Sequence, residues 1–207
     1  MKKLLVATTN PGKLAEYRGL LQGAPLEIVD LRDTGVDLEV AETGATFEEN
    51  ALLKARAYAS ATKLLTLADD SGLCVDALNG APGVFSARYA HGDRARIQKI
   101  LVEMKQVPDE RRSARFVCVI ALAWPGGEAV TFEGTCEGRI AHRPSGSHGF
   151  GFDPIFLFPE QAQTMAELPL SLKNQISHRA RAAIQAKAWL IGRLGDQPQS
   201  TQRTQRV

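Results

Sequence analysis

The chain has 207 residues, with 25 Lys+Arg against 23 Asp+Glu, and 44% of its residues are hydrophobic. This length favours one large domain, or one domain with a second lobe, that can bury a substantial core. The formal net charge of +2 excludes a global basic field for nucleic acid, so an anionic ligand requires a local cluster of cations.

The cysteines and the hydropathy pattern indicate in which cellular compartment the protein works. Cys74, Cys118 and Cys136 form no CxxC pair, which argues against a disulfide framework and against a cysteine-ligated zinc site. The apolar run near the N-terminus is too short for a signal peptide, and the sequence contains no run of about 18 apolar residues. The sequence therefore predicts a cytoplasmic protein that does not contact a membrane.

Strand and helix signals alternate in the first third of the chain. Hydrophobic patterning predicts a strand, a helix and a second strand over residues 2–8, 14–21 and 26–31. Thr46 and Glu49, three positions apart, form a capping box that predicts a helix to about residue 63. An apolar strand over residues 64–68 then runs into two acids, which we expect at the strand's end.

A long hairpin and a final helix are predicted in the rest of the chain. Residues 114–124 and 129–140 flank Pro-Gly-Gly-Glu, which is typical of a β-hairpin, and residues 97–104 have helical apolar spacing. Ser177 can cap a last helix, with an expected apolar face that includes Ala180, Ile184, Ala188 and Ile191. Together these elements predict an α/β fold with a mixed sheet, in a single domain over residues 1–195. The polar, Gln-rich residues 196–207 predict a disordered tail.

The turn after the first predicted strand has the features of a phosphate site. Free backbone N–H groups and the positive end of a helix dipole are expected there, and Lys13 adds a full charge. The segment is Thr8-Thr9-Asn10-Pro11-Gly12-Lys13. The Walker A pattern is absent. The alternative interpretation is an ordinary strand-to-helix turn with a solvated lysine.

Paired acids follow the third predicted strand in Asp69-Asp70-Ser71-Gly72. Adjacent carboxylates repel each other unless a cation compensates them, and hard oxygen ligands of this kind suit Mg²⁺. Because adjacent side chains point in different directions, one acid can bind metal while the other positions or deprotonates water. Glu42 could add a third carboxylate. The alternative is an Asx-type turn with two solvated acids.

Two later segments are suited to a flat, acceptor-rich ligand. Gly149-Phe150-Gly151-Phe152-Asp153-Pro154 places aromatic rings between glycines, which suits a ring that stacks close to the backbone. Lys173, His178 and Arg179 cluster at the start of the last helix and are rich in donors when charged. The alternative for the first segment is a tight turn that packs Phe into the core. The alternative for the second is a structural or solvated His-Arg pair. Together with the phosphate turn and the carboxylates, the two segments describe a Mg²⁺-dependent nucleotide site.

The ordered motifs resemble the inosine triphosphate pyrophosphatase family over roughly residues 2–194. The motifs that carry the resemblance are Thr8–Lys13, Glu42-Thr43-Gly44, Thr46–Ala51, Leu67–Leu73, Gly80–Gly83, Ser86–Tyr89, Gly149–Pro154 and Ser177–Arg179. Two positions depart from the family pattern. Thr9 stands where many members have Gly, and Ala41 replaces an acid, which removes one candidate metal ligand and leaves Glu42.

The resemblance implies a long twisted mixed sheet with flanking helices that form two lobes around a central cleft, in a homodimer. It implies hydrolysis of ITP, dITP or XTP to the monophosphate and pyrophosphate, with Asp70 as general base and Mg²⁺ held by Asp70, Glu42 and Asp69. It also implies that the triphosphate binds Thr8 to Lys13 and Lys54, close to Ser71. The base would then meet Phe150, Gly151, Phe152, Asp153, Lys173, His178 and Arg179.

Two other classes of protein compete with this interpretation. A nucleotide-binding or nucleic-acid-binding module could use the same cleft without turnover. Paired acids beside phosphate argue against it, because a pure anion binder gains nothing from them. A structural subunit with a degenerate site is the third possibility, and the presence of every expected catalytic residue type argues against that one. We therefore expect a small-molecule nucleoside triphosphate as the partner, and no nucleic acid.

Overall fold

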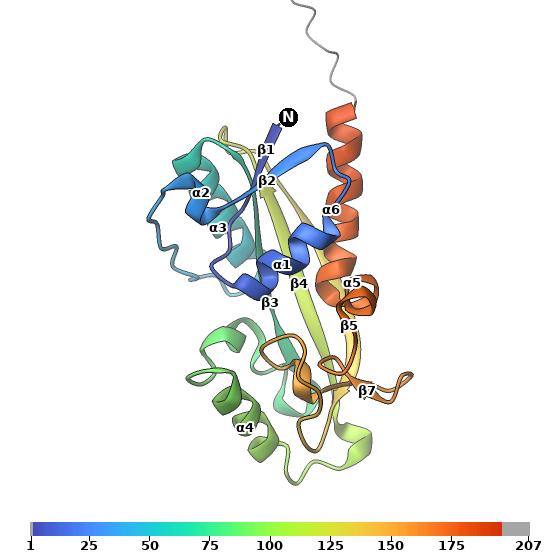
Figure 1. The fold of residues 1–207 in the computed structure, drawn as a ribbon. Coiled ribbons are helices and arrows are strands. Elements are labelled where there is room, and N and C mark those ends of the chain that lie inside the picture. Colours follow the sequence, from blue (N-terminus) through green and yellow to red (C-terminus); the bar gives the residue numbers. More distant parts are fainter. Residues whose placement is uncertain (1, 196–207) are drawn as a thin grey trace, which may run out of the picture.

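The computed structural model describes residues 2–195, so the predicted tail at residues 196–207 lies outside the described residues. A seven-stranded mixed sheet has the order β2-β1-β3-β4-β5-β6-β7 (Figure 1). The α/β fold with a mixed sheet predicted from the sequence is confirmed. Within residues 2–195, every helix is too short or too polar to cross a membrane.

The first half of the sheet is parallel. β1 (Lys2–Val6) pairs with β2 (Leu26–Asp30) on one side and with β3 (Leu65–Val75) on the other. Parallel neighbours require crossover connections, which are provided by α1 (Pro11–Leu20) before β2 and by α2 (Leu31–Thr34) and α3 (Phe47–Thr62) before β3. The predicted strand–helix–strand start of the chain is therefore confirmed.

The second half of the sheet is antiparallel. β4 (Ser113–Ala123) pairs with β3 and with β5 (Ala129–Ile140), which confirms the predicted hairpin. The edge is completed by β6 (Phe156–Phe158) and β7 (Gln163–Thr164). β3, β4 and β5 span 11, 11 and 12 residues and run through the length of the molecule (Figure 1). These three strands therefore belong to both the upper and the lower part of the molecule.

Helices cover both faces of the upper part of the sheet. α3 packs on one face against Ala68, Val119 and Ala121, whereas α1 and α6 (His178–Gly195) pack on the other against Leu67, Cys118 and Ile120. The lower part has its own core, in which α4 (Asp93–Glu103) packs beside the far halves of β3, β4 and β5. The remaining helical segments are η1 (Asp76–Leu78), η2 (Gly83–Arg88), η3 (Asp109–Arg111), η4 (Asp153–Ile155) and α5 (Leu170–Ile176).

The predicted end of the third strand is wrong. β3 does not stop at Ala68 but continues through both acids to Val75. The reason is tertiary: β4 offers a complete antiparallel edge, on which Asp69 pairs with Ile120 and Asp70 with Val119. Strand pairing over this length overrides the low strand propensity of Asp and Gly.

The predicted apolar face of the last helix is right at Ala180 and wrong at Ile184, Ala188 and Ile191. Ile184 and Ile191 are 54% and 43% exposed, whereas Ala180, Ala182, Ala183, Ala186 and Leu190 are buried. α6 lies directly on β5 at Gly134, where a Cβ atom would come within 2.2 Å of the His178 carbonyl oxygen. Such close approach selects the helix face with small side chains, so the alanine stripe is buried instead of the isoleucines.

Candidate active site

The two acids of β3 point to opposite faces of the sheet, as alternation along a strand requires. Asp69 lies on the face of α1 and α6, where it contacts Lys13 and Arg179. Asp70 lies on the face of α3, where it contacts Asn50 and Lys54. The two acids therefore belong to two distinct clusters on opposite faces of β3.

Asp69 is a buried counter-ion. Its carboxylate accepts a hydrogen bond from the Lys13 ammonium at 2.8 Å, and the Arg179 guanidinium lies 3.6 Å away. Burial opposes ionisation, but the charges of Lys13 and Arg179 outweigh it and hold the pKa of Asp69 well below its usual range. Asp69 is therefore ionised and already paired. Its contacts are with cations of this chain, and the role of Asp69 in supporting a metal stays a prediction.

Asp70 lies in a different environment. Its Oδ2 atom accepts a hydrogen bond from the Asn50 amide at 3.2 Å, and its Oδ1 atom lies 3.5 Å from the Lys54 ammonium. Burial is the largest influence and raises the pKa of Asp70, against the opposing charge of Lys54. A carboxylate with a raised pKa, held in place by an amide, suits a general base.

Glu42 and Asp70 converge on one cation, the ammonium of Lys54. Lys54 donates to Glu42 Oε1 and lies near Asp70 Oδ1, while Arg88 approaches Glu42 from η2 at 3.5 Å. Burial alone would lower the pKa of Lys54, but these carboxylates raise it. Hard oxygen atoms that face a common positive charge form a donor set that fits Mg²⁺. Among residues 2–195, no group of three or more His, Cys, Asp or Glu side chains is arranged to hold a metal ion.

The turn at residues 8–13 differs in one respect from its predicted form. Asn10 caps α1, and its side-chain oxygen accepts hydrogen bonds from the backbone N–H groups of Gly12 and Lys13 at 2.8 and 3.1 Å. The prediction that these N–H groups are free is therefore wrong, because Asn is a strong N-cap residue. Thr8 accepts from the Asn10 backbone at 3.2 Å, and Thr9 is exposed. The positive charge that this turn offers to a phosphate therefore comes mainly from the Lys13 side chain.

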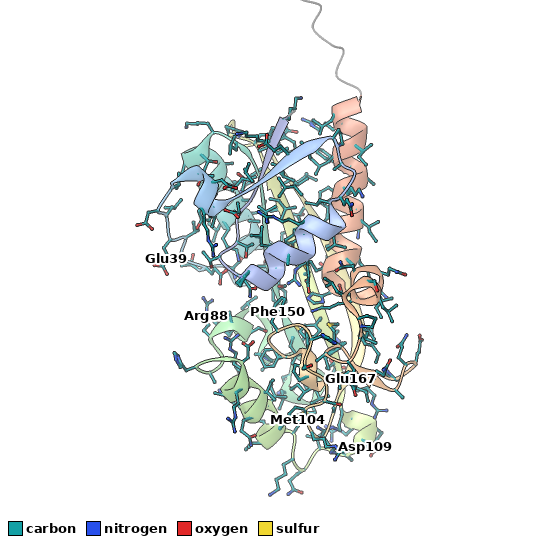
Figure 2. All side chains as sticks on the ribbon, in the orientation of Figure 1. Glu39, Arg88, Met104, Asp109, Phe150 and Glu167 are labelled. Atoms are coloured by element: carbon teal, nitrogen blue, oxygen red, sulfur yellow. The ribbon has the colours of Figure 1, made fainter. Side chains whose placement is uncertain are left out.

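The predicted ring slot lies next to this turn. A Cβ atom at Gly12 would come within 2.6 Å of the Phe150 ring, so the glycine allows the ring to pack on the turn's backbone. The loop bends through Gly149 and Gly151, both at positive φ, and Asp153 accepts from the Phe150 backbone at 3.0 Å. Figure 2 places Phe150 between the upper and lower parts of the molecule. Its partner in the motif, Phe152, is buried in the lower core.

A buried charge network lies beneath Phe150. Lys173 contacts Asp153 at 2.5 Å and Glu16 at 2.8 Å, and Arg179 donates to Glu16 at 2.6 Å and to Ser71 at 2.9 Å. Burial would raise the pKa of Glu16, but Arg179 and Lys173 lower it. The sequence analysis did not single out Glu16, because a single acidic residue on a helix carries no signal of its partners. Its role depends on Arg179, 163 positions later.

His178 departs from the charged donor expected at this position. Its ring stacks on Phe116 with centroids 4.7 Å apart, and burial is the main cause that lowers its pKa well below 6.5. Neighbouring Arg179 and Lys173 act in the same direction. His178 is therefore neutral and offers one donor and one acceptor to a ligand.

Members of each of these clusters line one cleft of about 180 Å³, whereas Lys54, Asp69 and Lys173 lie behind its lining residues as their ion-pair partners. Among residues 2–195, the buried side-chain nitrogen and oxygen atoms without a hydrogen-bond partner are Arg96 Nε, His178 Nδ1 and Arg179 Nε. All three residues line this cleft. Buried polar atoms are normally paired, so their convergence on one cleft marks where a polar ligand binds. The other lining residues include Asn10, Lys13, Glu42, Asp70, Ser71, Phe116, Phe150, Gly151, Phe152 and Asp153.

A larger hollow of about 590 Å³ lies at the far end of the molecule but lacks these features. His142 pairs with Asp109 at 2.5 Å on its exposed rim. Arg112, its buried cation, donates to the backbone carbonyls of Ile140 and Met104, both at 2.8 Å. With its polar groups already satisfied, this hollow is a weaker candidate than the cleft at Asp70.

Most of the residues singled out in the sequence meet in the cleft or in its supporting network. Residues 4–189 match the model of the Ham1 family. The chain belongs to the Ham1 family. This confirms the family resemblance expected from the ordered motifs.

Relatives and solved structures match nearly the whole chain. A dITP/XTP pyrophosphatase from Shouchella clausii is 51% identical over 93% of this chain and 98% of its own, and one from Bacillus subtilis is 49% identical over 88% and 93%. The structure of a HAM1 protein from Coxiella burnetii has a TM-score of 0.85 and 44% identity, covering 93% of this chain and 100% of that one. The Staphylococcus aureus Ham1 protein has a TM-score of 0.83 and 42% identity over the same shares.

Proposed function

We propose that this chain hydrolyses ITP, dITP and XTP to the nucleoside monophosphate and pyrophosphate, and so removes deaminated purines from the nucleotide pool. One observation carries the proposal. A single cleft joins a general-base candidate beside Glu42 and Lys54 to unpartnered donors beside an aromatic ring. The names of the relatives, dITP/XTP pyrophosphatase, support the same reaction.

In the proposed reaction, Asp70 takes a proton from water as the water oxygen bonds to the α-phosphorus. The bond from that phosphorus to the α,β-bridging oxygen breaks, and pyrophosphate leaves. Asn50 keeps the Asp70 carboxylate oriented. Lys13 in the cleft lining, and Lys54 beside Glu42 and Asp70, bring positive charge to the triphosphate. Glu42 and Asp70 are the residues that would hold Mg²⁺, which when bound neutralises charge on phosphate oxygens.

Base selection is proposed to depend on the atom at position 6 of the purine. Inosine and xanthine carry an oxygen acceptor there, whereas adenine carries an amino donor. Arg179 and Lys173 are donors only, and Glu16 and Asp153 hold them in place. A 6-amino group would leave the buried Nε atom of Arg179, which has no partner within the protein, unpaired. We expect ITP and XTP to exceed ATP in kcat/KM by about 10²-fold or more.

The proposal also covers the cellular location, the metal requirement and the oligomeric state of the enzyme. We propose that the enzyme works in the cytoplasm on small nucleotides, requires Mg²⁺ and forms a homodimer, as the family resemblance implies. A balanced overall charge with cations concentrated in one cleft suits a nucleoside triphosphate better than a nucleic acid polymer.

The deciding experiment measures pyrophosphate release from ITP, dITP, XTP, GTP and ATP by the purified chain, with Mg²⁺ and with a chelator. We expect release from ITP, dITP and XTP that depends on Mg²⁺ and is lost in Asp70→Asn. Tight binding of ITP without product would favour a nucleotide-binding module instead. Release of orthophosphate rather than pyrophosphate would place the attack at another phosphorus and contradict the proposed reaction.

A further inference from the structure

A third residue of the cleft has a buried polar atom without a partner, and the sequence motifs do not include it. Arg96, on α4, has a side chain that is 21% exposed, yet its Nε atom is buried without a partner. His178 and Arg179 line the cleft from α6, whereas Arg96 lines it from α4. The helix α4 lies in the lower part of the molecule (Figure 1). The cleft therefore presents donors from two separate elements.

Asp93 contacts both Arg96 and the loop that contains Phe150 and Gly151, where the base is proposed to bind. One oxygen of Asp93 lies 3.3 Å from the Arg96 guanidinium, and the other accepts from the Gly151 backbone at 2.8 Å. Gly151 follows Phe150, the ring against which a base would stack. Arg96 is thus anchored to the ring-slot loop, while its Nε atom remains available. Because each oxygen of Asp93 already holds a donor, Asp93 acts here as a positioning residue.

We propose that Arg96 reads position 2 of the purine and favours xanthine over guanine. This inference rests on the proposed function. ITP, XTP and GTP share the 6-oxo group and differ at position 2, where they carry hydrogen, oxygen and an amino group respectively. A guanidinium only donates hydrogen bonds. It satisfies the 2-oxo acceptor of xanthine, gains no hydrogen bond from hypoxanthine, and faces another donor in guanine, which leaves two donors unpaired in a buried place.

This assignment divides recognition between two elements. The unpartnered Nε donor of Arg179 selects the 6-oxo group and so separates ITP, XTP and GTP from ATP. Arg96 then separates XTP from GTP. Since all of these substrates carry the same triphosphate, a change confined to the ratio of XTP to GTP isolates the position-2 contact from general attraction of phosphate.

The test compares kcat/KM for ITP, XTP, GTP and dITP in the full chain and in Arg96→Ala. We expect the ratio of XTP to GTP to fall about tenfold or more, mainly through slower XTP, with ITP as the internal reference. Arg96→Lys keeps the charge without the planar fork and should lower the same ratio. Arg94→Ala removes an exposed cation from the same helix and should leave the ratio unchanged.

Several outcomes overturn the inference while leaving the proposed hydrolysis intact. An unchanged ratio of XTP to GTP in Arg96→Ala rejects it, and so does an equal loss on every substrate, which would indicate a phosphate contact. A change confined to the ratio of ITP to dITP would indicate contact with the ribose and also reject it. Calorimetric binding of XMP and GMP gives a readout without turnover: Arg96→Ala should lose affinity for XMP and not for GMP. A wild-type chain that hydrolyses none of the nucleotides would reject the proposed function itself.

Discussion

The ammonium of Lys13 lies 2.8 Å from the carboxylate of Asp69 and joins the first turn of α1 to the middle of β3. The carboxylate is almost wholly buried, whereas the lysine still reaches the cleft. Asp69 therefore fixes the position of Lys13 while offsetting part of its charge. A phosphate that enters the cleft meets a cation whose place is already set, which lowers the entropic cost of binding.

Replacing Lys13 with Ala should weaken triphosphate binding. A hydrogen bond to a charged group contributes about 1.5–3 kcal/mol, so we expect KM for ITP to rise by about 10- to 100-fold. Steady-state kinetics with ITP measures the effect, and Lys3→Ala, an exposed lysine of β1, is the matched control. An unchanged KM and kcat/KM in Lys13→Ala would mean that the Lys13–Asp69 pair only stabilises the turn.

Asp70→Asn should nearly abolish turnover and preserve the fold. The substitution keeps the shape of the side chain but removes the proton acceptor, so we expect kcat to fall by about 10³-fold or more. Asp37→Asn changes an exposed acid and should retain the wild-type rate. The check is kcat for ITP together with the melting temperature of each variant. Retention of more than about a tenth of the rate in Asp70→Asn would remove Asp70 from the role of base.

Local sequence patterns predicted most elements but misplaced the acids within the sheet. The apolar run at residues 64–68 identifies the start of β3, and the capping residue Thr46 identifies the start of α3. The continuation of β3 to Val75 depends on pairing with β4, about 50 residues later, which no local pattern encodes. The reciprocal half of the capping box differs too, because Glu49 accepts from the Ala45 backbone at 2.6 Å.

Residue types and their order predicted which residues line the cleft, but they did not predict which residues contact one another there. Asp70, Lys13, Phe150 and Arg179 were singled out, and all of them line the cleft. Glu16 and Arg96 were missed, because a lone charged residue on a helix gives no local signal of its partners. Their importance comes from distant parts of the chain, which only the folded molecule brings together.

Glu16→Gln should destabilise the fold markedly. Glu16 compensates the buried charges of both Lys173 and Arg179, and removal of one partner from a buried pair costs about 3–5 kcal/mol because it leaves uncompensated charge. Urea unfolding measures the loss. Glu27→Gln disrupts an exposed pair with Lys3 at 3.9 Å and should cost less than about 1 kcal/mol. Equal effects of the two substitutions would show that Glu16 contributes no more than a surface pair.

The stability of the protein should fall on mild acidification, with His178 as an identifiable contributor. Burial holds the pKa of His178 well below its ordinary 6.5, so below that pH the unfolded chain binds a proton at His178 that the folded chain does not. The unfolding free energy therefore falls as pH drops from 6.5 toward the lower folded-state pKa. Between about pH 7.5 and about pH 5.5, this single group accounts for a loss on the order of 1 kcal/mol.

Urea unfolding at both pH values, in the wild type and in His178→Gln, isolates the contribution of His178 from the other titrating groups. The variant is less stable at both pH values, because the stacking contact of the ring with Phe116 is lost. It should nevertheless lose less stability than the wild type over the same pH interval, by on the order of 1 kcal/mol, because glutamine binds no proton in either state. His91→Gln removes an exposed histidine and provides the control, which should follow the wild-type pH dependence. If His178→Gln and the wild type lose stability in parallel, His178 is not the neutral buried group that its packing indicates.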